Sequence, residues 1–209
     1  MREVDKVLDK NEKIFWEGKP KFWPFFVTGN IPSFIFGLVW LAFLAPFIFL
    51  NSNTGFEFSF GFNLFLLPFL LVGLWMIVGM PVYKLLLYPH LFYSITSKRV
   101  IIQKGVIGRD FEYIDFDQIT NAEVNVGFWD KILGNGTGSI RIFSAGSFNF
   151  DRSGKQISKP YTISNIENPY EIFKLFKKLS HAIKTDIQFP NQYRPSKNPG
   201  YNTNFNPKS

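Results

Sequence analysis

Two long stretches without charged side chains dominate the first half of the chain. They cover residues 31–50 and 62–83, and the whole of residues 22–83 contains one charged residue, Glu57. A helix of about 20 residues extends about 30 Å, the thickness of the hydrocarbon core of a membrane. The pattern therefore predicts two transmembrane helices joined by the short loop 51–61. The alternative, two helices buried in a soluble core, is disfavoured by uncharged runs of this length.

The ends and interior of these helices suggest an anchor. Asn30 is the expected N-cap of the first helix, Pro32 falls in its expected first turn, and Pro46 is expected to kink it. Neither apolar run contains an ionisable residue, whereas ion pathways and proton relays usually need some. The hairpin is therefore interpreted as an anchor, with a pore formed by oligomerisation as the alternative.

Basic residues flank the hairpin on the side of the two termini. The loop 51–61 has no Lys or Arg, so the positive-inside rule predicts a multi-pass protein of the cell membrane with both termini in the cytoplasm. Aromatic residues near the same boundary could form an interfacial belt. The basic residues are Lys13, Lys19, Lys21, Lys84, Lys98 and Arg99, and the aromatic ones are Trp16, Trp23, Tyr83 and Tyr88.

From Leu91 onwards apolar and polar residues alternate with a period of two. About seven short strands are expected, separated by turn residues such as Ser97 and Gly105, which is typical of an antiparallel barrel or sandwich. The alternating segments lie at 91–96, 100–104, 110–113, 122–126, 140–142, 148–150 and 161–163.

One helix is expected after the strands. Asn168, Pro169 and Glu171 form a start resembling a capping box. An apolar stripe at helical spacing follows, and it is expected to pack on the open end of the barrel. An amphipathic helix lying on the membrane is the alternative. The stripe consists of Ile172, Leu175, Phe176, Leu179 and Ile183.

Five segments in a fixed order resemble the bacterial pleckstrin-homology-like (PH-like) membrane proteins, the YdbS-like group. They are Glu12–Pro20, Tyr93–Ile102, Lys104–Ile107, Ile114–Ile119 and Leu133–Gly138. Such proteins have an E-x-x-x-x-x-G-x-P lead, a two-helix hairpin, a Y-x-x-T-x-x-R strand turn and a G-x-G segment before a late strand. The resemblance covers roughly residues 10–185 and implies a PH-like barrel capped by the C-terminal helix. The resemblance assigns no catalytic role to any residue of this chain.

The expected fold class is therefore an α+β membrane protein with a two-helix transmembrane hairpin, a PH-like antiparallel β-barrel and a capping C-terminal α-helix. The expected parts are a cytoplasmic N-terminal segment (1–30), the hairpin (31–87), the PH-like domain (88–188) and a disordered tail (189–209). The tail is rich in Asn, Pro and Lys and has no apolar period. The strand limits within 144–160 stay open.

Composition excludes several classes of site. The net charge of +7 is spread along the chain, so no dense basic run indicates nucleic acid. The absence of Cys excludes a disulfide framework, a thiolate metal site and a Cys nucleophile. His90 and His181, the two histidines, form no expected metal or acid–base pair. No catalytic residue, metal or cofactor is predicted, and the chain is expected not to be an enzyme.

Five cations are candidates for binding an anionic lipid headgroup. Lys98 and Arg99 stand at the turn between the first two expected strands, and three more could extend the patch near an anionic leaflet. An ordinary solvated turn is the alternative. The full candidate set is Lys84, Lys98, Arg99, Lys104 and Arg109.

The predicted function is a non-enzymatic scaffold that is anchored in the membrane and makes protein or lipid contacts at its cytoplasmic face. The expected partners are the membrane, an anionic lipid, an unidentified protein and further copies of the chain. The alternative is an oligomeric pore or transport accessory built from the hairpins.

Overall fold

The chain divides into two compact units. We describe a computed structural model over residues 3–53, 60–134, 136–144, 148–150 and 156–188. One unit is the helical segment Phe25–Tyr88, and the other combines Met1–Pro24 with Pro89–Ser209. The N-terminal segment thus belongs to the same unit as the strands, and the prediction of a disordered tail at 189–209 lies outside the described residues.

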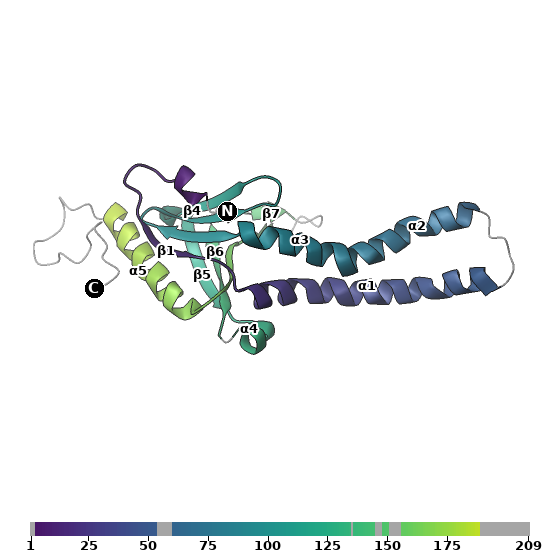
Figure 1. Cartoon of the computed structure of the whole chain (residues 1–209). Helices are drawn as coiled ribbons and strands as arrows, with labels where there is room; N and C mark the ends of the chain where they lie inside the picture. The colour runs from purple at the N-terminus through teal and green to yellow at the C-terminus, as the bar shows by residue number, and fades with distance from the viewer. Residues whose placement is uncertain (1–2, 54–59, 135, 145–147, 151–155, 189–209) are drawn as a thin grey trace, which may run out of the picture. The chain divides into compact units, whose positions relative to one another are not determined.

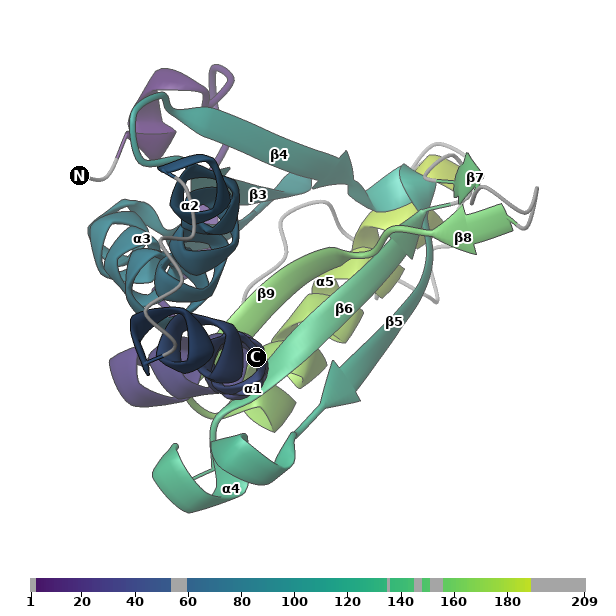
Figure 2. The ribbon, with the colours of Figure 1, turned by 90° about the vertical axis from the view of Figure 1, so that its right-hand side faces the viewer.

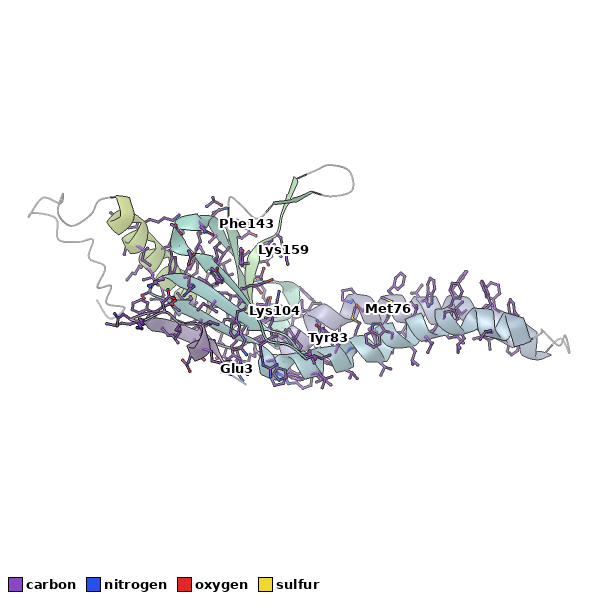
Figure 3. All side chains as sticks on the ribbon, turned by 90° about the horizontal axis from the view of Figure 1, so that it is seen from above. Glu3, Met76, Tyr83, Lys104, Phe143 and Lys159 are labelled. Atoms are coloured by element: carbon purple, nitrogen blue, oxygen red, sulfur yellow. The ribbon has the colours of Figure 1, made fainter. Side chains whose placement is uncertain are left out.

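Two long apolar helices form the hairpin. The first is α1 (Phe22–Asn53), and the second runs through α2 (Phe60–Leu74), a π-helical turn η2 (Trp75–Gly79) and α3 (Met80–Leu87). Spans of 28 and 27 residues are long and apolar enough to cross a membrane. In an apolar 18-residue stretch of each span, only 11% of the residues are buried. Apolar side chains project outward along both helices (Figure 3). This exposure is expected for helices solvated by lipid and disfavours the alternative of buried core helices.

The first helix begins earlier than its pattern predicts. It starts at Phe22, so Asn30 is an interior residue and its predicted role as N-cap is wrong. Pro32 lies in the helix interior for the same reason. A Cβ at Gly73 of α2 would collide with Leu41 of α1. The small residue at this position therefore allows the two helices to approach closely.

The strands form antiparallel sheets (Figure 1). A four-stranded sheet has the order β1 (Ile14–Gly18), β2 (Phe92–Thr96), β3 (Arg99–Lys104) and β4 (Asp110–Asp115). A three-stranded sheet has the order β5 (Ile119–Asn125), β6 (Gly138–Ser144) and β9 (Tyr161–Ile166). A small hairpin pairs β7 (Phe148–Phe150) with β8 (Gln156–Ser158). The expected antiparallel architecture is confirmed, and β1 and β8 are additional strands.

The C-terminal helix completes the core. Figure 2 shows α5 (Pro169–Gln188) lying along the sheet of β5, β6 and β9. Ile172, Phe176 and Leu179 are buried with the isoleucines of β6 and β9. The predicted packing of this helix on the strands is confirmed, and the alternative of a membrane-lying helix is wrong because its apolar stripe is already covered.

Four short helices complete the described chain. They are η1 (Val4–Lys6), η3 (Tyr88–His90), η4 (Phe116–Gln118) and α4 (Phe128–Leu133). The last of these was not expected from the sequence, and it precedes the glycine-rich segment that leads into β6.

Candidate functional site

The N-terminal segment, residues 3–18, contributes β1 to the four-stranded sheet, called the first sheet below, and contains a cluster of buried polar and charged side chains. β1 pairs with β2, with Ile14 opposite Thr96 and Gly18 opposite Tyr93. Val4 is fully buried against Phe92 and Ile101. The segment is therefore fixed at both its ends, and the residues between them are held over the turn that joins β2 to β3.

Glu12 is the centre of this cluster. Its side chain is fully buried and accepts two hydrogen bonds from Arg99, from Nε at 3.1 Å and from Nη2 at 2.8 Å. Thr96 Oγ1 donates to the same carboxylate at 2.6 Å, and the backbone N–H of Asp9 donates at 2.9 Å. Four donors thus surround one carboxylate, which satisfies the condition under which a buried charge is tolerated.

Electrostatics of the cluster favour the charged forms of both partners. Burial alone would raise the pKa of Glu12, but the hydrogen bonds from Arg99, Thr96 and Asp9 outweigh it and lower that pKa to about 2. The hydrogen bond to Glu12 raises the pKa of Arg99 against the effect of burial. The pair therefore remains ionised throughout the physiological pH range.

Lys98 belongs to the edge of the same cluster. Its Nζ lies 3.1 Å from Asp9 Oδ2, and Arg99 Nη2 also lies 3.1 Å from that oxygen. The hydrogen bond from Lys98, followed by the charge of Arg99, lowers the pKa of Asp9. Of the five candidate headgroup cations, the two at this turn, Lys98 and Arg99, thus have carboxylate partners within the chain.

The other candidate cations lie elsewhere. Lys104 pairs with Glu112, and Arg109 Nε lies 3.5 Å from Glu3 Oε1. Figure 3 labels Lys104 and Glu3, and also Lys159, whose Nζ lies 3.8 Å from Glu112 Oε1. Lys84 belongs to the helical unit, where its Nζ lies 3.5 Å from the carbonyl oxygen of Phe25.

The structure does not bring the five candidates together. Arg99 begins β3 and Lys104 ends it, so these two residues are separated by about 17 Å of extended strand. Lys98 and Arg99 lie at one end of the first sheet, and Lys104 and Arg109 flank the turn at its other end. A headgroup site at any of these cations stays a prediction, and the surrounding carboxylates reduce the positive charge available to it.

A second buried cluster holds α4. Asp130 is buried and accepts hydrogen bonds from Thr137 Oγ1 at 2.9 Å, from Asn165 Nδ2 at 2.9 Å and from the backbone N–H of Gly127 at 3.0 Å. The bond from Gly127 satisfies one of the free N–H groups at the helix start. Asp130 therefore joins α4 to the loop before β6 and to the end of β9.

Both connections to the hairpin are short and hydrogen-bonded. The backbone N–H of Lys21 donates to the carbonyl oxygen of Asn165 at 2.7 Å, and α1 begins at the next residue. Gln103 Nε2 donates to the carbonyl oxygen of His90 at 3.3 Å, and β2 begins two residues after His90. Both hydrogen bonds lie within the unit that contains the strands, next to the two places where the chain leaves that unit for the helices.

These clusters bind and position chain segments. Among the described residues, no group of three or more His, Cys, Asp or Glu side chains could hold a metal ion. The roles of Glu12 and Asp130 were missed by sequence reasoning. Glu12 stands in the E-x-x-x-x-x-G-x-P lead, which marks the residue but not its partner 87 positions away.

Comparison with known proteins supports the architecture. The sequence profile of a family described as Bacterial PH domain matches residues 33–178, which is more than half of the chain. No curated protein and no solved structure matches the chain. The match concerns the family as a whole, so the YdbS-like assignment stays a prediction.

Proposed function

We propose that this chain, which belongs to the bacterial PH domain family, is a non-enzymatic scaffold that is anchored in the cell membrane by its hairpin. Its PH-like domain presents an interaction surface at the cytoplasmic face, and both termini lie on that side. This orientation follows from the basic residues that flank the hairpin, such as Lys21 and Lys84.

The short connections between the domain and the two helices carry the proposal. Lys21 is bonded to Asn165 of β9 immediately before α1, and His90 is bonded to Gln103 of β3 immediately before β2. A long flexible linker would let a domain sample a large volume, whereas here only a few residues separate the domain from each helix, which keeps it near the membrane surface. Such a domain is suited to holding a partner at the membrane.

The outer edge of β5 is a candidate surface for a protein partner. Among the described strands, β5 is paired with β6 alone, so its other edge has no strand neighbour. An extended peptide can add to such an edge through main-chain hydrogen bonds. Thr120, Asn121 and Glu123 are exposed there, and Glu123 lies 3.3 Å from Arg141 of β6.

Intramolecular pairing of the candidate cations favours a protein partner over an anionic lipid for the main interaction. Lys98 and Arg99 face Asp9 and Glu12, and Lys104 faces Glu112. A headgroup would have to compete with carboxylates already in place.

Site-specific photo-crosslinking in native membranes tests the scaffold role. The full chain carries a photoreactive amino acid at Asn121 or Glu123 on β5, with Lys178 on the exposed side of α5 as the matched control. The proposal predicts one saturable protein adduct from β5 and none from Lys178. The same pattern at all three positions, or adducts with lipid alone, would contradict it.

The pore or transport accessory stays an alternative prediction. Its test is the conductance of the full chain reconstituted in planar bilayers, which the scaffold proposal predicts to equal that of bilayers without protein.

A further inference from the structure

We infer that the PH-like domain inserts two separate apolar tips, α4 and the β3–β4 turn, into the interfacial layer of the bilayer; together they are called the apolar edge. This inference rests on the proposed membrane anchoring and adds a second, non-covalent contact between the domain and the membrane. It concerns apolar side chains, whereas the predicted headgroup site consists of cations, two of which, Lys104 and Arg109, flank the same turn.

The first part of this edge is α4. Phe128 is 67% exposed and Ile132 is 54% exposed, although both are large apolar side chains on a folded element. Leu133 is also exposed, and the rings of Phe128 and Trp129 lie 5.2 Å apart in an edge-to-face arrangement. Aromatic and aliphatic side chains of this kind, with Lys131 between them, are typical of elements that lie in a membrane interface.

The position of α4 within the domain brings it near the first connection to the hairpin. Asp130 of α4 accepts a hydrogen bond from Asn165 Nδ2, and the carbonyl oxygen of Asn165 accepts one from Lys21. The next residues are Phe22 and Trp23, and Trp23 is exposed at the start of α1. Trp side chains favour the membrane interface, so Trp23 marks the place where the chain is expected to enter that layer. Two hydrogen bonds link α4 to Lys21, two residues before Trp23.

The second part of the edge is the turn between β3 and β4. Ile107 at this turn is 101% exposed, and Gly105 has a φ of +115°, which allows the chain to reverse there. The turn follows directly after Gln103, whose side chain donates to the carbonyl oxygen of His90 at the second connection. Each apolar tip therefore belongs to, or directly follows, an element that is hydrogen-bonded near one of the two connections.

The positions of α4 and Ile107 near the two connections favour the bilayer as the partner that covers them. A protein partner could cover an apolar patch anywhere on the domain, whereas a membrane can cover only patches near the attachment points. α4 and Ile107 come from different elements. Asp130 of α4 is bonded to Asn165, which is bonded to Lys21 at the first connection, and Gln103, four residues before Ile107, is bonded to His90 at the second. Asp130, the acidic residue of α4, is buried, so no exposed carboxylate on this helix opposes contact with an anionic leaflet.

The natural absence of Cys makes a single-probe experiment direct. Full-length variants Ile132→Cys, Ile107→Cys and Lys178→Cys are labelled with an environment-sensitive fluorophore. They are reconstituted in vesicles of phosphatidylcholine and phosphatidylglycerol. Quenching by spin-labelled lipid is compared with quenching by aqueous iodide. Lys178, exposed on α5, is the control, and Phe128→Cys replaces Ile132→Cys if that variant unfolds.

The inference predicts blue-shifted emission at positions 132 and 107, with lipid quenching at least threefold stronger than at position 178. Equal quenching at all three positions would overturn it. Protection from both quenchers would also overturn it, because another protein copy would then cover the edge. Alkaline extraction of the same vesicles separates the two proposals: a chain that stays in the membrane without lipid quenching refutes the docking edge alone, and an extracted chain refutes both.

Discussion

At the scale of single residues, the pair of Glu12 and Arg99 fixes the N-terminal segment to the first sheet. A buried carboxylate with four donors is stable only while every partner remains in place. Loss of one charge leaves the other buried and unpaired, which is more costly than replacing both.

Glu12→Gln is therefore expected to lower the free energy of unfolding by about 3 kcal/mol. The measurement is urea unfolding of the full chain in detergent, with Asp117→Asn at an exposed position as the control. The double variant Glu12→Leu with Arg99→Met is expected to be less destabilised than the sum of its single variants. Strict additivity of the two substitutions would contradict the described pairing.

The same carboxylate predicts a dependence of stability on pH. The pKa of Glu12 is about 2 in the folded chain, against 4.5 when unperturbed. The group therefore stabilises the fold fully above pH 4.5, and this contribution is lost as the pH falls towards 2. The shift corresponds to about 3 kcal/mol. Unfolding of the parent chain and of Glu12→Gln between pH 6 and pH 2 measures it, and the difference between the two curves should narrow steadily below pH 4.5 and be smallest at pH 2.

The sequence predicts Arg99 as a functional cation but cannot predict its partner. Local spacing shows a charged residue in a turn, whereas Glu12 reaches Arg99 only because β1 pairs with β2. The same limit applies to Asp130, whose partners Thr137 and Asn165 come from two later segments.

At the scale of elements, α5 is expected to provide a large part of the stability of the domain. Phe176 is almost fully buried, and its ring lies 5.8 Å from that of Phe116. Phe176→Ala is expected to cost about 3–5 kcal/mol, because it removes apolar contacts and leaves a cavity. Lys177→Ala, one residue further and exposed, should change the free energy of unfolding by less than about 0.5 kcal/mol. Similar losses in both variants would show that α5 does not pack as described.

The buried carboxylate of α4 gives a second prediction at this scale. Asp130→Asn replaces one acceptor oxygen by a donor and should cost about 1–3 kcal/mol. Hydrogen exchange is expected to accelerate at α4 (Phe128–Leu133) and to remain unchanged at β2 and β3. Lys131→Gln, at the exposed neighbouring position, serves as the control. Unchanged exchange at α4 would show that Asp130 does not hold this helix.

The sequence pattern predicts elements that have one buried and one exposed face. It also predicts long elements whose residues are apolar throughout, such as the two helices of the hairpin. The strands around 140–142 and 161–163 and the helix from Pro169 are of the first kind. β1 was missed because all five of its residues are half-buried, which removes the alternation. α4 was missed because six residues are too short to show a helical period. The early start of α1 was hidden by Pro24, Gly29 and Asn30, which resemble a helix boundary.

At the scale of the whole molecule, the position of the hairpin in the sequence explains how the first sheet is completed. The hairpin is inserted between β1 and β2, two neighbouring strands of one sheet. The domain therefore closes only when the chain before and after the hairpin meets. The resemblance to the bacterial PH-like family, confirmed by the match over residues 33–178, indicated the hairpin and barrel. It could not indicate the contacts that join β1 to the remainder of the domain.

The most direct test of membrane anchoring and of the predicted orientation is the accessibility of single cysteines in oriented membrane vesicles. Ser59→Cys probes the loop between the helices, and Lys178→Cys probes the domain. With an impermeant maleimide, position 59 should react in right-side-out vesicles and position 178 only in inverted ones, and the chain should resist alkaline extraction. Reaction of both positions from the same side, or extraction of the chain, would contradict a membrane-spanning hairpin with a cytoplasmic PH-like domain.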